Sequence, residues 1–168
     1  MKLNSSRFAI MLFVGLLTMS GCQQQQSTST TGEGGTTGMT AEVDPHDIPL
    51  TEAEIESLKT GLTSYEDALG KIKGYRDAIH DAITAGNPPG AHRSLDELDI
   101  VLGHLPTAAR EFSIPKSEWE TINTSAQRTR ELFNQIHSQI DAGETPDFDG
   151  VAEEINRQIA SLEGVATS

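Results

Sequence analysis

After residue 50, apolar side chains recur at intervals of three and four residues over four successive segments. This spacing places them on one face of an α-helix. Turn-forming residues separate the segments: GNPPG at 86–90, SIP at 113–115 and DAGETPD at 141–147. Because each connection is short, consecutive helices should fold back on one another. The pattern predicts an all-α fold, an antiparallel up-down-up-down four-helix bundle, over residues 50–165.

The first segment, about residues 52–85, is the longest and the least regular. Its heptad pattern is interrupted at Arg76, where an apolar residue is expected. The sequences TEAE at 51–54 and TSYE at 63–66 each predict a capping box, so the stable helix begins at one or the other. Three glycines, each costing about 1 kcal/mol relative to Ala in a helix, are Gly61, Gly70 and Gly74. The apolar positions are Ile55, Leu58, Leu62, Tyr65, Leu69, Ile72, Ile79 and Ile83.

The apolar faces of the other three segments begin at residues 91, 119 and 148. Pro106 lies just off the apolar face of the second, and it should bend that helix or end it early. Ser113 is the predicted N-cap of the third. The apolar positions are Ala91, Leu95, Leu98, Leu102, Leu105, Ala109 and Phe112; Trp119, Ile122, Ala126, Thr129, Phe133, Ile136 and Ile140; and Phe148, Val151, Ile155, Ile159 and Leu162.

A polar stripe flanks the apolar faces of the first two segments. Arg76 and His80 are one helical turn apart, and His92, Asp96 and Asp99 follow at spacings of four and three. In an antiparallel hairpin that turns near residue 88, position 76 lies level with about 100 and position 80 with about 96. We therefore expect Arg76 to face Asp99 or Asp96, with both histidines nearby.

This interhelix polar cluster has two interpretations. Arg76 in a helix interface needs a carboxylate partner, because an unpaired buried charge is costly, and the cluster is then an ion pair that sets the register. Alternatively, His80, His92, Asp96 and Asp99 supply two imidazoles and two carboxylates, enough ligands for Zn or Cu. The cation of Arg76 disfavours a metal, so the ion pair is preferred. The histidines expected to be solvated or at a boundary, and not ligands, are His46, His104 and His137.

The N-terminus has a different pattern. Two basic residues, Lys2 and Arg7, precede a 12-residue apolar run, FAIMLFVGLLTM at 8–19. As a helix this run covers about 18 Å, short of the roughly 30 Å hydrocarbon core of a bilayer. A basic start, a short apolar core and small residues at the exit are typical of a secretory signal peptide, here residues 1–21.

The exit of that segment, MSGC at 19–22, resembles the lipobox of bacterial lipoproteins, with Met19 where Leu is usual. The resemblance implies cleavage before Cys22, a diacylglyceryl thioether on its sulfur and usually a third acyl chain, such as palmitate, on its amine. Two or more chains give stable anchoring. Gln23 follows, and in enteric-type sorting a residue other than Asp there implies the outer membrane. We therefore expect a protein anchored by lipid in the bacterial envelope, at the outer membrane and facing the periplasm.

Residues 22–49 form a polar segment rich in Gln, Ser, Thr and Gly. Such a segment cannot bury enough apolar surface to offset its chain entropy, so it predicts a disordered tether. Its reach as a flexible chain is about 30 Å. Cys22 is the only cysteine, so the rest of the chain has neither a disulfide nor a thiolate metal site.

Acidic residues outnumber basic ones by 25 to 12. Without the basic residues of the signal peptide the net charge is −15, which argues against nucleic acid and anionic lipid headgroups as partners. The chain also lacks a nucleophile elbow, a phosphate loop and a zinc-protease motif, so we expect no enzyme.

An exported helical bundle is similar in architecture to the cytochromes c-prime and b562. However, the haem-attachment motif C-x-x-C-H is absent, and the only Met after the signal peptide is Met39, outside the predicted bundle, so no Met is available there as a haem ligand. We therefore expect no cofactor. About 16 residues from Ala91 to Pro106 resemble a segment of small exported helical proteins of bacteria, and this resemblance supports the fold more than any activity. The expected function is a lipid-anchored binding or structural module with an unidentified protein partner. The alternative is a metal- or haem-binding bundle in metal handling or electron transfer.

Overall fold

The computed structural model describes residues 48–166, and within that range the chain is helical, without a strand. The all-α prediction is confirmed. The predicted signal peptide, Cys22 and nearly all of the predicted tether lie outside the described residues. The elements, in chain order, are α1 (Glu52–Thr60), α2 (Tyr65–Thr84), a 3-10 turn (Pro88–Ala91), α3 (His92–Glu111), a 3-10 turn (Lys116–Glu118), α4 (Trp119–Asp141) and α5 (Phe148–Ala166).

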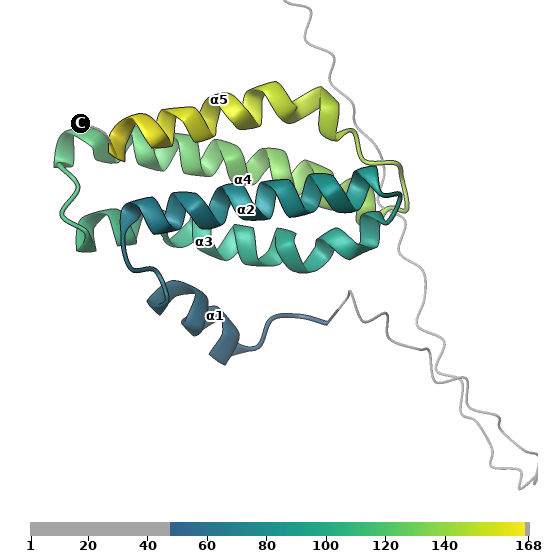
Figure 1. Ribbon diagram of the computed structural model, residues 1–168, viewed down its shortest axis with the longest axis horizontal. Helices are drawn as coiled ribbons and strands as arrows, with labels where there is room; N and C mark the ends of the chain where they lie inside the picture. The colour runs from purple at the N-terminus through teal and green to yellow at the C-terminus, as the bar shows by residue number, and fades with distance from the viewer. Residues whose placement is uncertain (1–47, 167–168) are drawn as a thin grey trace, which may run out of the picture. The chain divides into compact units, whose positions relative to one another are not determined.

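The four long helices, α2 to α5, lie side by side, and the short helix α1 is set against α3 (Figure 1). Helix α2 packs against both α3 and α5, and α4 packs against the same two helices. Helices α2 and α5 run in opposite directions: the Tyr65 hydroxyl donates to the Leu162 carbonyl at 3.2 Å, whereas the His80 ring lies against Phe148. Each long helix therefore packs against two other long helices.

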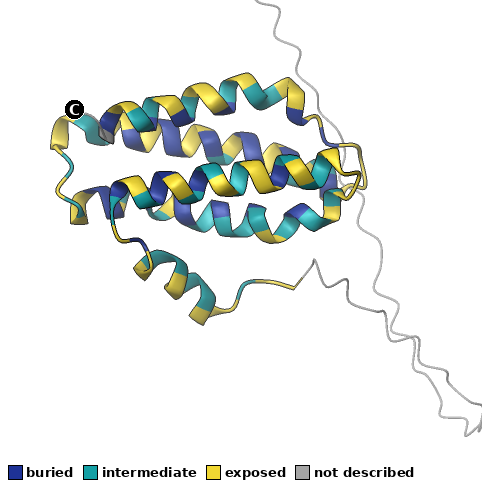
Figure 2. Ribbon diagram, in the orientation of Figure 1, coloured by how far each residue is buried: buried dark blue, intermediate teal, exposed yellow. Residues whose placement is uncertain are grey.

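The predicted apolar faces of α3, α4 and α5 form most of the core (Figure 2). Thr129 is fully buried with them, and its hydroxyl donates to the Ser125 carbonyl at 2.7 Å. The buried stripe is wider than the predicted one because each helix faces two neighbours and not one. The additional buried apolar residues include Ala68, Val101, Ala108, Leu132 and Val165.

The first predicted helix is in fact two helices, and the chain turns between them at residues 61–64. The predicted capping box at 51–54 is confirmed: Thr51 accepts from the Glu54 amide, and Glu54 accepts from the Thr51 amide. Helix α1 buries no residue fully, but Ile55 and Leu58 are half-buried. It is therefore a short helix attached to the others and not part of a long α2.

The second capping box was predicted one residue too early. The N-cap of α2 is Ser64, whose hydroxyl accepts from the Asp67 amide at 3.1 Å. The Asp67 carboxylate accepts in return from the Thr63 amide at 3.0 Å. Adjacent Thr and Ser residues can both cap a helix, and their spacing to the following acidic residue does not distinguish them.

At two further helix ends, one of the two expected effects of Pro106 is excluded, and the predicted N-cap at Ser113 was wrong. Helix α3 does not end at Pro106 but continues to Glu111, with Leu105 and Ala109 buried on either side of the proline. Ser113 is not the N-cap of α4. It has a φ of 60°, and the Ile114 amide donates to the Ala109 carbonyl at 2.8 Å, so it belongs to the left-handed C-cap of α3.

Candidate functional site

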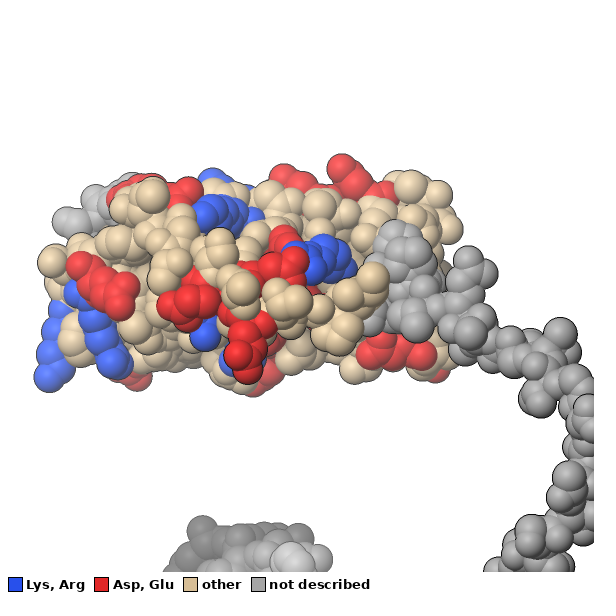
Figure 3. Space-filling model, turned by 90° about the horizontal axis from the view of Figure 1, so that it is seen from below, with Lys and Arg blue, Asp and Glu red and all other residues tan. Residues whose placement is uncertain are grey.

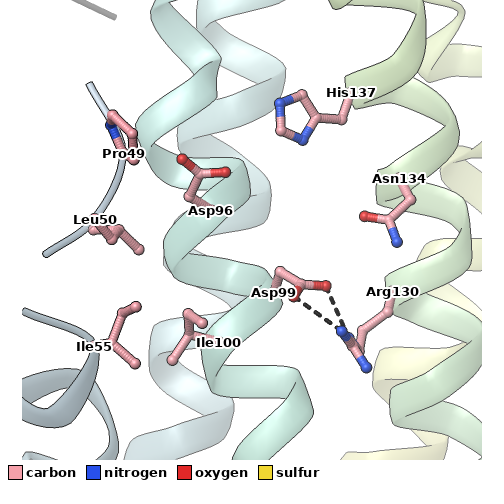
Figure 4. Close-up of a pocket in the computed structure, with 9 residues that line it drawn as sticks. All are labelled: Pro49, Leu50, Ile55, Asp96, Asp99, Ile100, Arg130, Asn134 and His137. Atoms are coloured by element: carbon pink, nitrogen blue, oxygen red, sulfur yellow. Dashed lines mark hydrogen bonds and ion pairs between the residues drawn. The ribbon is translucent and has the colours of Figure 1, made fainter. Parts of the chain in front are cut away.

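Asp99 forms its ion pair with α4, not with α2. Arg130 donates from two nitrogens to the two carboxylate oxygens of Asp99, at 2.8 and 2.9 Å (Figure 4). These hydrogen bonds raise the pKa of Arg130 above its ordinary value. A bidentate pair of this kind fixes direction as well as distance, so it links the middle of α3 to the middle of α4.

Arg76 lies at the other side of α2, against α5. Its guanidinium donates to Asp77 at 2.8 Å and to Asn156 at 3.1 Å. The predicted pairing of Arg76 with Asp99 or Asp96 is therefore wrong. Counting residues from the turn near residue 88 predicts how far along its helix each residue lies. It does not predict which edge of the helix carries that residue. Position 76 is on the edge of α2 that faces α5.

His80 lies with Arg76, and this separates it from His92. The His80 ring is 4.9 Å from the ring of Phe148, at the start of α5. His92 is the first residue of α3 and contacts α4 instead. The predicted metal ligands His80, His92 and Asp96 are thus divided between two helix interfaces.

Two residues of α4 that were not among the predicted ligands lie against the His92 ring. Its ring centroid is 5.2 Å from that of His137, and its Nε2 is 3.2 Å from an oxygen of Asp141. His137 Nε2 is 3.6 Å from the same oxygen. The His92 side chain is 12% exposed and that of Asp141 is 61% exposed, so the group lies at the surface end of the α3–α4 interface.

A surface pocket of about 400 Å³ adjoins this group. Figure 4 shows Asp96 on α3 and His137 on α4 at one end of it, and the Asp99–Arg130 pair at the other. Leu50 and Ile55, from α1 and the chain before it, form a third wall. The full lining is Pro49, Leu50, Ile55, Asp96, Asp99, Ile100, Arg130, Asn134 and His137.

The sequence did contain a signal for His137 and Asp141. They are four residues apart, so they lie on the same side of a helix. Positions equally far from the turn near residue 115 lie opposite each other in the antiparallel pair of α3 and α4. This places position 137 opposite His92. The Asp99–Arg130 pair obeys the same register. The two residues were missed because partners for His92 were sought only on the first segment.

Comparisons with known proteins add no family to this geometry. No family model, curated protein or solved structure matches the chain. Among residues 48–166, no helix combines the length and the apolar character that crossing a bilayer requires.

Proposed function

We propose that the protein is a lipid-anchored module of the bacterial cell envelope, with a non-catalytic body that binds a partner. The body is proposed to be an antiparallel up-down-up-down four-helix bundle with α1 as an appendage. Two observations support this class: each long helix packs against two others, and the turns between consecutive long helices are short.

The anchor rests on one observation, the segment MSGC at 19–22 directly after a basic start and a 12-residue apolar run. The run is too short to span a bilayer as a helix, which favours a signal that is removed. Acylation of Cys22 then holds the protein at the membrane. The polar residues that follow separate the lipid from the helices.

The negative charge of the helical body favours a partner that can bind to a negatively charged surface. On the face drawn in Figure 3, acidic side chains gather across the middle, with basic side chains at one end and beside them. The chain carries a net charge of −13. Anionic lipid headgroups and nucleic acid are disfavoured by this charge. Metal binding is a second candidate function, favoured by the group at His92, His137 and Asp141.

The anchor can be tested by expressing the full chain in a Gram-negative bacterium with radiolabelled palmitate. We expect the wild-type protein to carry label and to fractionate with the outer membrane. Cys22→Ala should carry none, and Ser20→Ala, which keeps a small residue in the lipobox, should behave as wild type. Equal labelling of wild type and Cys22→Ala, or no labelling of either, contradicts the proposal.

A further inference from the structure

Three side chains at the end of the α3–α4 interface have the spacing of metal ligands. One nitrogen or oxygen from each of His92, His137 and Asp141 lies within 4.8 Å of the others. A tetrahedral zinc ion with bonds of about 2.0–2.2 Å places its ligand atoms roughly 3.3–3.6 Å apart. The two distances to the Asp141 oxygen, 3.2 and 3.6 Å, are close to that spacing.

The backbone holds these ligands in place. His137 and Asp141 are one turn apart near the end of α4, and both point towards the start of α3. His92 follows directly on the 3-10 turn Pro88–Ala91, whose last residue is fully buried. The three ligands therefore come from two packed helices and need only side-chain adjustment to close around an ion.

The charge around the group favours a cation. Asp96 lines the same pocket as His137, one turn after His92 on α3. The nearby cation in that pocket, Arg130, is bound to Asp99 through both carboxylate oxygens. Arg76 was the sequence-based objection to a metal, but it contacts Asn156 on α5 and not this interface.

We propose that His92, His137 and Asp141 bind a divalent transition-metal ion, with Zn²⁺ as the ion to test. Two imidazoles and one carboxylate suit Zn and Cu better than Mg or Ca, which prefer oxygen ligands only. Three protein ligands leave a further position open to water or to an exogenous ligand. The negative charge of Asp96 stabilises the bound ion without direct coordination. This site does not depend on the lipid anchor, and Cys22→Ala should retain it.

The test is calorimetric titration of ZnCl₂ into the full chain, purified in detergent without a polyhistidine tag and stripped with a chelator. We expect saturable binding of one ion per chain. Loss of an outer-shell partner of a metal ligand typically weakens binding by about 10- to 100-fold, so His92→Gln and His137→Gln should each weaken it by at least about 100-fold. Asp141→Asn, at an exposed position, should weaken binding strongly without affecting the fold.

The matched controls are His80→Gln and His104→Gln, which remove imidazoles elsewhere on the long helices. Both should bind Zn²⁺ as wild type does, and Asp96→Asn should lose less than about tenfold. Circular dichroism establishes that each variant is folded. The proposal is overturned by the absence of saturable binding to the wild type. It is equally overturned if the His92→Gln, His137→Gln double variant binds with unchanged affinity, because the ion would then sit on other surface groups.

Discussion

Replacing Gly70 and Gly74 in α2 by alanine should stabilise the protein. Both glycines are exposed and helical, and a Cβ atom built on either would meet no atom within 4 Å. Ala is favoured over Gly in a helix interior by about 0.8–1.0 kcal/mol. The double variant should therefore gain about 2 kcal/mol in its free energy of unfolding.

Urea denaturation followed by circular dichroism at 222 nm measures this gain. With a slope of about 2 kcal/mol per molar urea, the midpoint should rise by about 1 M, and the slope should not change. Metal-free protein is used so that binding does not contribute to the measured stability.

Gly143→Ala is the control with the opposite sign. A Cβ atom at this position also meets nothing within 4 Å, but the φ of Gly143 is 68°. Left-handed backbone costs a residue with a Cβ atom about 1–2 kcal/mol, so the midpoint should fall by about 0.5–1 M. A lower midpoint for the Gly70→Ala, Gly74→Ala variant would refute the reasoning, since it would mean that these positions are occupied by something other than solvent.

Two further predictions concern the ends of helices. Ser113→Gly should raise the free energy of unfolding by about 0.5–1 kcal/mol in the same denaturation assay, because Ser113 occupies a left-handed C-cap that glycine adopts without strain. An unchanged or lower midpoint would contradict this. Glu54 should titrate in a carbon-detected NMR experiment with a pKa of about 2, because hydrogen bonds from Thr51 and Arg93 stabilise its carboxylate. Because the folded pKa of Glu54 is lowered from 4.5, the stability that Glu54 contributes is present above pH 4.5 and is lost as the pH falls towards 2. An unchanged pKa of Glu54 in an Arg93→Ala variant would exclude a contribution from Arg93.

The sequence predicted correctly which residues are buried wherever this depends on the geometry of a single helix. The intervals of three and four identified Leu98, Leu102, Ile136 and Ile155, all of them essentially inaccessible to solvent. Such spacing depends only on the geometry of the α-helix and on one face being apolar. It does not say which edge of a helix faces which neighbour. For this reason Arg76, a residue of α2, was predicted to face α3, although it faces α5.

The candidate site was predicted only in part, for a related reason. His92 and Asp96 were identified from the polar stripe on the second segment, and both lie at the α3–α4 interface. Their partners depend on which of two adjacent helices the stripe meets, and the spacing within one segment cannot decide this. The ends of helices were also ambiguous, because Ser113 is equally suited to end one helix or to begin the next.

The attachment of α1 has a mechanical consequence. The N-terminal chain enters the helices through α1, which has no fully buried residue and is joined to α3 partly by the exposed ion pair of Glu54 with Arg93. A pulling force on that chain acts on α1 before it reaches the core. Peeling residues 48–60 away from α3 would add up to about 43–47 Å of extended chain while α2 to α5 stay folded. Helix α1 would then work as an extensible link that takes up load between the N-terminus and the long helices.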